Sequence, residues 1–164
     1  MMYRALVIRG ATGGIVAGIA MAMWSMILMW LSGSGFWTPL NLIAHTFWRD
    51  APLDGSFSLG AMVISLVVHM MMSGGLGAVL ALLLGTIGRW AITTAGATAI
   101  GAVFGVVVWL VMQFVVWRLV DPAAAERFTP WVFAIGHVIY GVVTGLAVGS
   151  ARTSTRTMGS PGAR

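Results

Sequence analysis

The chain has 164 residues, of which 59% are hydrophobic and 8% are charged, and its net charge is +5. Soluble domains carry charged side chains at about a quarter of their positions, so this composition excludes an ordinary soluble enzyme, a nucleic-acid-binding protein and a disordered chain. The absence of cysteine excludes disulfides and thiolate metal sites. The class that remains is an integral membrane protein.

Four long apolar stretches without Asp, Glu or Lys predict four transmembrane helices, because each offers the ~20 apolar residues that one span needs. They are 11–32, 59–85, 90–117 and 130–150. The first exceeds a signal-peptide core and predicts an uncleaved signal anchor. We therefore expect an all-α bundle of four transmembrane helices over residues 1–150. The segment 151–164, which is rich in Ser, Thr, Gly and Pro, predicts a disordered cytoplasmic tail.

The few charges predict the orientation of these helices. The N-terminus, the turn at 86–89 and the C-terminal tail carry six arginines, including Arg89, and no acid; the loops at 33–58 and 118–129 carry three arginines and all four acids. By the positive-inside rule, both termini lie in the cytoplasm and both acidic loops lie outside. All nine basic residues are arginine, a choice typical of GC-rich bacterial genomes, so a bacterial inner membrane is expected.

The sequence also repeats itself. Small residues and a tryptophan recur between the first and third spans, and a histidine with the small residues after it recurs between the second and fourth. The pairs are Gly14 and Gly101, Gly18 and Gly105, Trp30 and Trp117, His69 and His137, Ser73 and Gly141, and Gly77 and Gly145. This pattern predicts two tandem helical hairpins, 10–86 and 89–150, related by a pseudo-twofold axis along the membrane normal.

Small residues recur every four positions along each span, which places them on one helix face and lets two backbones approach closely. The sequence therefore predicts tight helix packing, within or between chains. The packing residues are Gly14, Gly18, Ser73, Gly77, Gly101, Gly105, Gly141 and Gly145.

His69 and His137 each precede a small-residue position by one turn, so both are expected at a helix interface. The simpler interpretation is a neutral histidine hydrogen-bonded to a neighbouring helix. The alternative is bis-histidine ligation of a b-type haem, for which the glycines would make room. A transition-metal site is less favoured, because no carboxylate or thiolate stands at that depth to complete the shell.

The outer loop at 33–58 carries six apolar or aromatic residues that line one side of a short helix. They are Phe36, Trp37, Leu40, Ile43, Phe47 and Trp48. A short interfacial helix in the headgroup plane is the favoured interpretation, and a lid over the bundle is the alternative. Two N-cap-and-proline pairs, Thr38-Pro39 and Asp121-Pro122, predict one short helix in each outer loop.

Three segments of the chain resemble a family of small four-helix bacterial membrane proteins known as hypothetical proteins. They are Gly35-Phe36-Trp37-Thr38-Pro39-Leu40-Asn41-Leu42-Ile43-Ala44, Val108-Trp109-Leu110-Val111-Met112, and the stretch 131–141 that contains His137. The resemblance implies four spans and a bacterial membrane. It implies no activity and assigns no functional residue.

No catalytic motif occurs, so a non-enzymatic protein is expected. The favoured function is helix–helix association in the lipid bilayer, as an accessory subunit of a membrane complex or as a homo-oligomer, without cofactor or nucleic acid. The alternatives are a haem-b electron carrier that uses His69 and His137, and a small-solute channel or transporter.

Overall fold

The computed structural model describes residues 2–87 and 93–158, and in these ranges every regular element is helical. The long helices are α1 (Met2–Leu31), α3 (Leu59–Ile87), α4 (Thr94–Val111) and α7 (Pro130–Met158). After α4 the chain continues without a break through a π-helical turn, η2 (Met112–Val116), and α5 (Trp117–Val120). All four helical rods are long and apolar enough to cross a membrane, which confirms the predicted number of long apolar helices.

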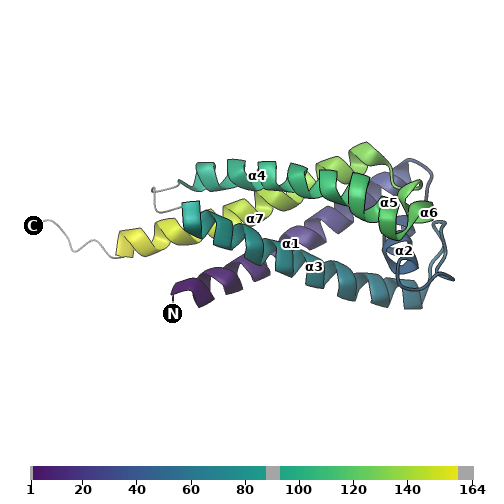
Figure 1. Cartoon of the computed structure of the whole chain (residues 1–164), viewed down its shortest axis with the longest axis horizontal. Helices are drawn as coiled ribbons and strands as arrows, with labels where there is room; N and C mark the ends of the chain where they lie inside the picture. Colours follow the sequence, from purple (N-terminus) through teal and green to yellow (C-terminus); the bar gives the residue numbers. More distant parts are fainter. Residues whose placement is uncertain (1, 88–92, 159–164) are drawn as a thin grey trace, which may run out of the picture.

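The two loops that carry the short helices lie at one end of the bundle, and the beginning of α1 and the end of α7 lie at the other (Figure 1). The short helices are α2 (Thr38–His45) and α6 (Pro122–Ala125). In the middle of the bundle α1 packs against α7, while α3 packs on the outside of α1 and α4 on the outside of α7. Helices α3 and α4 have few contacts with each other. The distance between them increases toward the end of the bundle that carries α2 (Figure 1).

Glycines make the two tightest helix pairs possible. In the pair α1–α3, a Cβ atom on Gly14 would collide with the carbonyl oxygen of Ser73 and the Cα atom of Gly77. In the pair α4–α7, a Cβ atom on Gly101 would collide with the carbonyl oxygen of Gly141 and meet the Cα atom of Gly145. Gly18 and Gly105 lie one turn further along, against Ser73 and the backbone of His137. The predicted packing residues therefore lie inside the chain's own helix pairs.

The helix ends differ from the predicted ones. The segment 151–158 continues α7 to Met158, where a disordered tail was expected from residue 151. It contains no Gly or Pro, so nothing in it interrupts the backbone hydrogen bonds of a helix. The rest of the expected tail, 159–164, and the inner turn with Arg89 and Trp90 lie outside the described residues. The third span was expected at 90–117, whereas its described part begins at Thr94 and continues through η2 and α5 to Val120.

The short helix α2 corrects the expectation of an interfacial helix. Seven of its eight residues are buried, and it packs against α3, α1 and α6. Asn41 donates hydrogen bonds to the carbonyl oxygens of Asp54 and Ser56, at 2.8 and 2.9 Å, and Ser65 donates one to the carbonyl oxygen of Leu40. The apolar side of α2 therefore packs against α1 and α3. This position agrees with the alternative interpretation of this helix, a lid over the bundle.

An ionic cluster around the buried carboxylate of Asp121 ties α2 to the second half of the chain. The carboxylate of Asp121, which is 0% exposed, lies 2.6 Å from Nδ1 of His45 and 2.8 Å from Nη1 of Arg49. Its other oxygen accepts a hydrogen bond from the backbone N–H of Ala124 and so caps α6. Arg49 also donates to the carbonyl oxygen of Val120. One carboxylate thus holds the loops 33–58 and 118–129 together.

Candidate functional site

The widening between α3 and α4 contains a cavity of about 380 Å³. Side chains from α1, α2, α3, the α4–η2–α5 rod and α7 line it, and most of them are apolar. The residues that α2 contributes include Pro39, Leu40 and Ile43, so the buried outer helix forms one end of the cavity. Cavities of ~300–1,000 Å³ with apolar walls and a few polar groups are typical of small-ligand sites.

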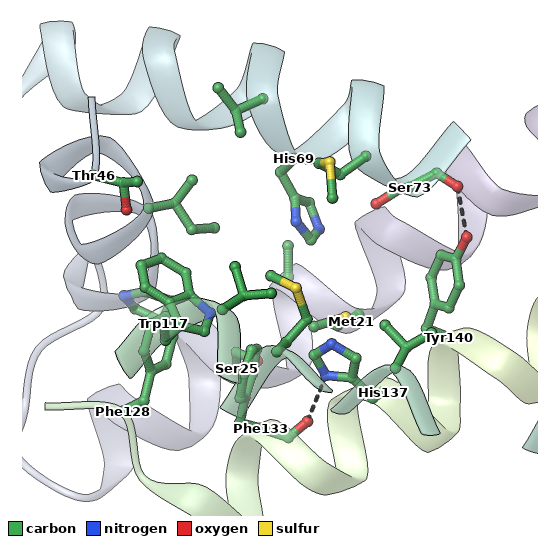
Figure 2. Close-up of a pocket in the computed structure, with 18 of the residues that line it drawn as sticks. Met21, Ser25, Thr46, His69, Ser73, Trp117, Phe128, Phe133, His137 and Tyr140 are labelled. Atoms are coloured by element: carbon green, nitrogen blue, oxygen red, sulfur yellow. Dashed lines mark hydrogen bonds between the residues drawn. The ribbon is translucent and has the colours of Figure 1, made fainter. Parts of the chain in front are cut away.

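Two histidines face this cavity from opposite sides, His69 from α3 and His137 from α7 (Figure 2). Nε2 of His69 donates a hydrogen bond to the carbonyl oxygen of Gly18 at 2.9 Å, and Nδ1 of His137 donates one to the carbonyl oxygen of Phe133 at 2.9 Å. A carbonyl can only accept, so these bonds fix the tautomer of each neutral ring. Nδ1 of His69 and Nε2 of His137 therefore carry lone pairs.

Other polar groups lie around the two rings. Tyr140 donates its hydroxyl hydrogen to the carbonyl oxygen of Ser73 at 2.5 Å, and this bond spans α7 and α3 (Figure 2). Trp117 and Thr46 line the cavity. Within the described part of the chain, the indole nitrogen of Trp117 and the hydroxyl oxygen of Thr46 have no hydrogen-bond partner. Trp117 is only 7% exposed. A buried polar atom without a partner costs free energy, so both atoms are candidates to contact a ligand.

Three methionines complete the lining with soft sulfur atoms. Met21 comes from α1, Met72 from α3 and Met112 from η2. Met21 lies between His69 and His137 in the view of Figure 2. Within residues 2–87 and 93–158, no three side chains of His, Cys, Asp or Glu come close enough to hold a metal ion. A metal at this site would therefore need the thioethers as ligands.

The haem alternative needs both rings on opposite faces of one porphyrin. Nε2 of His137 is free for such a bond, but Nε2 of His69 is bonded to Gly18. Nδ1 of His69 is next to the ring carbon that carries the side chain, so a porphyrin bound there would press against the Cβ atom. The two rings suit a small ligand better than a haem, which would require His69 to turn over.

The structure brings together His69, His137 and Ser73 at the cavity, whereas the predicted packing glycines lie in the helix pairs behind it. Sequence reasoning missed the roles of Trp117, Thr46 and the three methionines. The sequence drew attention to Trp117 through its match to Trp30, and this match was interpreted as part of the repeat. The methionines gave no signal, because an apolar thioether also suits a lipid-facing or core position.

Comparisons with protein-family models, curated proteins and solved structures find no match for this chain. The resemblance to the family of hypothetical four-helix bacterial membrane proteins therefore stays a prediction. The function has to be argued from the cavity itself.

Proposed function

We propose that this protein is a multi-pass membrane protein that binds a small ligand in the cavity between its two halves, without chemical turnover. The observation that carries the proposal is the pair of opposed imidazoles in one apolar cavity. Each ring donates its N–H to a backbone carbonyl and keeps a lone pair for the cavity. The two lone pairs can bind either a hydrogen-bond donor or a metal ion, since both accept electron density from a ring nitrogen.

We further propose that the four long helices span a bacterial inner membrane with both termini in the cytoplasm. Large apolar side chains are exposed along all four helical rods, as on a lipid-facing surface, for example Val16, Val67, Val107 and Ile135. The distribution of arginines and acids supports the orientation.

The orientation predicts which engineered cysteines react from outside the cell. The chain contains no cysteine, so Asp50→Cys and Ala5→Cys each introduce a single thiol at an exposed position. A membrane-impermeant maleimide is expected to label Asp50→Cys in intact spheroplasts and Ala5→Cys only after permeabilisation. Labelling in the reverse order would invert the topology.

A duplicated hairpin is part of the same proposal. Gly14 meets Ser73 and Gly77 as Gly101 meets Gly141 and Gly145, and these are the residues that the repeat equates. A common ancestor of both hairpins explains why the same contacts recur at matched positions. His69 and His137 then approach the cavity from equivalent helices, α3 and α7.

Association with other membrane subunits or with a second copy stays a prediction, as does a small-solute channel or transporter. The glycine faces on which the association hypothesis rested are occupied by the chain's own helices. An association would therefore use the larger side chains on the lipid-facing surface. The cavity favours ligand binding over both hypotheses as the function of the single chain.

The ligand-binding proposal predicts that protein released from its own membrane carries additional mass. Native mass spectrometry from lipid nanodiscs should detect a non-protein species on the wild type, and on the control Met26→Leu, which lies outside the cavity. The double variant His69→Gln and His137→Asn should lose it, because both cavity-facing ring nitrogens are gone. Equal occupancy in wild type and double variant, or an empty wild type, would contradict the proposal.

A further inference from the structure

We propose that the ligand is a soft monovalent metal ion, Cu(I), held by Nδ1 of His69, Nε2 of His137 and thioether sulfurs of the methionines that line the cavity. This inference rests on the proposed function, since it names the ligand of that same cavity. It differs from the sequence-based expectation because thioethers take the place of the missing carboxylates and thiolates.

The hydrogen bonds of both rings are those of metal-ligating histidines. A histidine that binds a metal usually donates its other N–H to a backbone carbonyl or a carboxylate, which fixes the tautomer and aims the free nitrogen at the ion. Here His69 uses the carbonyl of Gly18 and His137 that of Phe133. Both free nitrogens belong to residues that line one cavity (Figure 2). The hydrogen bonds that would orient these two ligands are therefore present without the metal ion.

The sulfur atoms select the metal. Thioethers are soft ligands that suit Cu(I), while Mg²⁺ and Ca²⁺ require oxygen and structural Zn²⁺ takes four Cys, His or carboxylate ligands. Met21, which is 8% exposed, lines the cavity together with both histidines, and Met72 and Met112 line it as well. Two imidazoles with one or more thioethers form a donor set for Cu(I) rather than for a harder ion.

The electrostatics of the cavity favour a single charge. Among the described residues that line it there is no Asp or Glu, and the donor atoms are neutral. Placing an ion among apolar groups costs more as its charge rises, because the lost hydration grows with the charge. A monovalent ion with neutral ligands is therefore the least costly metal for this site.

Met72 places a thioether next to His69. It lies one turn after His69 on α3, which puts the thioether and the ring on the same helix face, and it lines the same cavity. His69 and Met72 can therefore contribute two ligands from one helix.

The proposal is tested by anaerobic titration of the full-length protein in nanodiscs with Cu(I), in competition with a chromophoric Cu(I) chelator. His69→Gln and His137→Asn are the sharpest variants, because the new amide N–H can still reach the carbonyl of Gly18 or Phe133 while the cavity-facing nitrogen disappears. Each is expected to lower the Cu(I) affinity by more than ~100-fold, beyond the ~10–100-fold loss that an outer hydrogen bond accounts for.

Methionine variants provide a matched pair on one helix. Met21→Leu and Met26→Leu make the same volume-conserving change at two buried positions of α1, of which only Met21 lines the cavity. Met21→Leu is expected to weaken Cu(I) binding at least ~10-fold, and Met26→Leu to leave it unchanged. Ag(I), another soft monovalent ion, should follow the same order, and Zn²⁺ should not compete.

The outcomes separate the two proposals. Stoichiometric Cu(I) binding that both histidine variants weaken supports this inference. Cu(I) binding that is absent, or unaffected by the variants and by Met21→Leu, overturns it. If native mass spectrometry then finds an organic molecule that depends on both histidines, the proposed ligand-binding function still holds. An empty cavity in every preparation overturns both.

Discussion

Gly77→Ala is expected to destabilise the bundle by about 2 kcal/mol, whereas Gly75→Ala, two residues away on α3, should stabilise it by about 1 kcal/mol. A Cβ atom on Gly77 would overlap the carbonyl oxygen of Gly10 and the Cα atom of Gly14, whereas one on Gly75 meets no atom within 4 Å. Both variants gain the same helix propensity. The difference between them therefore isolates the contact between α1 and α3.

The overlap at Gly77 cannot be relieved by a side-chain rotation, because the neighbouring atoms belong to the backbone of α1. The helices have to move apart, and they lose dispersion contacts along the whole pair. Equilibrium unfolding in mixed micelles, followed by circular dichroism, measures both variants against the wild type. Equal stabilities for the two variants would show that α1 and α3 do not pack as described.

Asp121→Asn is expected to cost about 2 kcal/mol, because the buried His45 loses its charged hydrogen-bond partner, while Arg49, whose side chain is 55% exposed, loses little. The amide oxygen of asparagine can still accept the hydrogen bond from Ala124, so the cap of α6 is retained and only the charge is lost. Asp50→Asn, on the exposed part of the same loop region, should change the stability by less than about 0.5 kcal/mol.

The same carboxylate predicts a pH dependence. Burial of Asp121 favours its neutral form, but the hydrogen bonds from His45 and Ala124 and the charge of Arg49 outweigh this and lower the pKa of its carboxyl. Its folded pKa then lies below the unfolded value of about 3.9, so its contribution is complete above about pH 4 and is lost as the pH falls through the folded pKa.

Unfolding curves from pH 6 to pH 2 measure this effect as the difference between wild type and Asp121→Asn. Asp54 also has a lowered pKa, because Ser56 donates hydrogen bonds to its exposed carboxylate, but this group is present in both proteins and cancels. The stability advantage of the wild type should shrink below about pH 4. A difference that stays constant down to pH 2 would mean that Asp121 does not ionise in the cluster.

The sequence predicted the long helices and the residues that bring them together, because both depend on local pattern. An apolar stretch of 20 or more residues and a four-residue spacing of glycines are both patterns of residues that lie close together in the sequence. The cavity could not be predicted in this way. Its walls come from helices separated by more than 100 residues, and Met21 looks the same in the sequence as the exposed Met23.

The ionic cluster escaped prediction for the same reason. His45 and Asp121 are 76 residues apart, and neither has a local partner that would mark it as paired. The position of α2 depends on this pairing and on Asn41, so its apolar face was assigned to the membrane surface instead of the protein interior. Polar contacts between loops have no sequence period, and only the folded chain reveals them.

The π-helical turn η2 has a consequence for the two matched tryptophans. Trp30 and Trp117 each lie twelve residues after a packing glycine, yet Trp30 is 61% exposed and Trp117 only 7%. In η2 the N–H of Trp117 bonds to the carbonyl of Met112, five residues back, so the rod is wound more loosely there and later side chains are turned by about 100°. Two helical rods with the same number of residues after the packing glycine thus present different faces at the end that carries α2. The looser winding at η2, rather than the residue type, leaves Trp30 exposed and makes Trp117 part of the cavity wall.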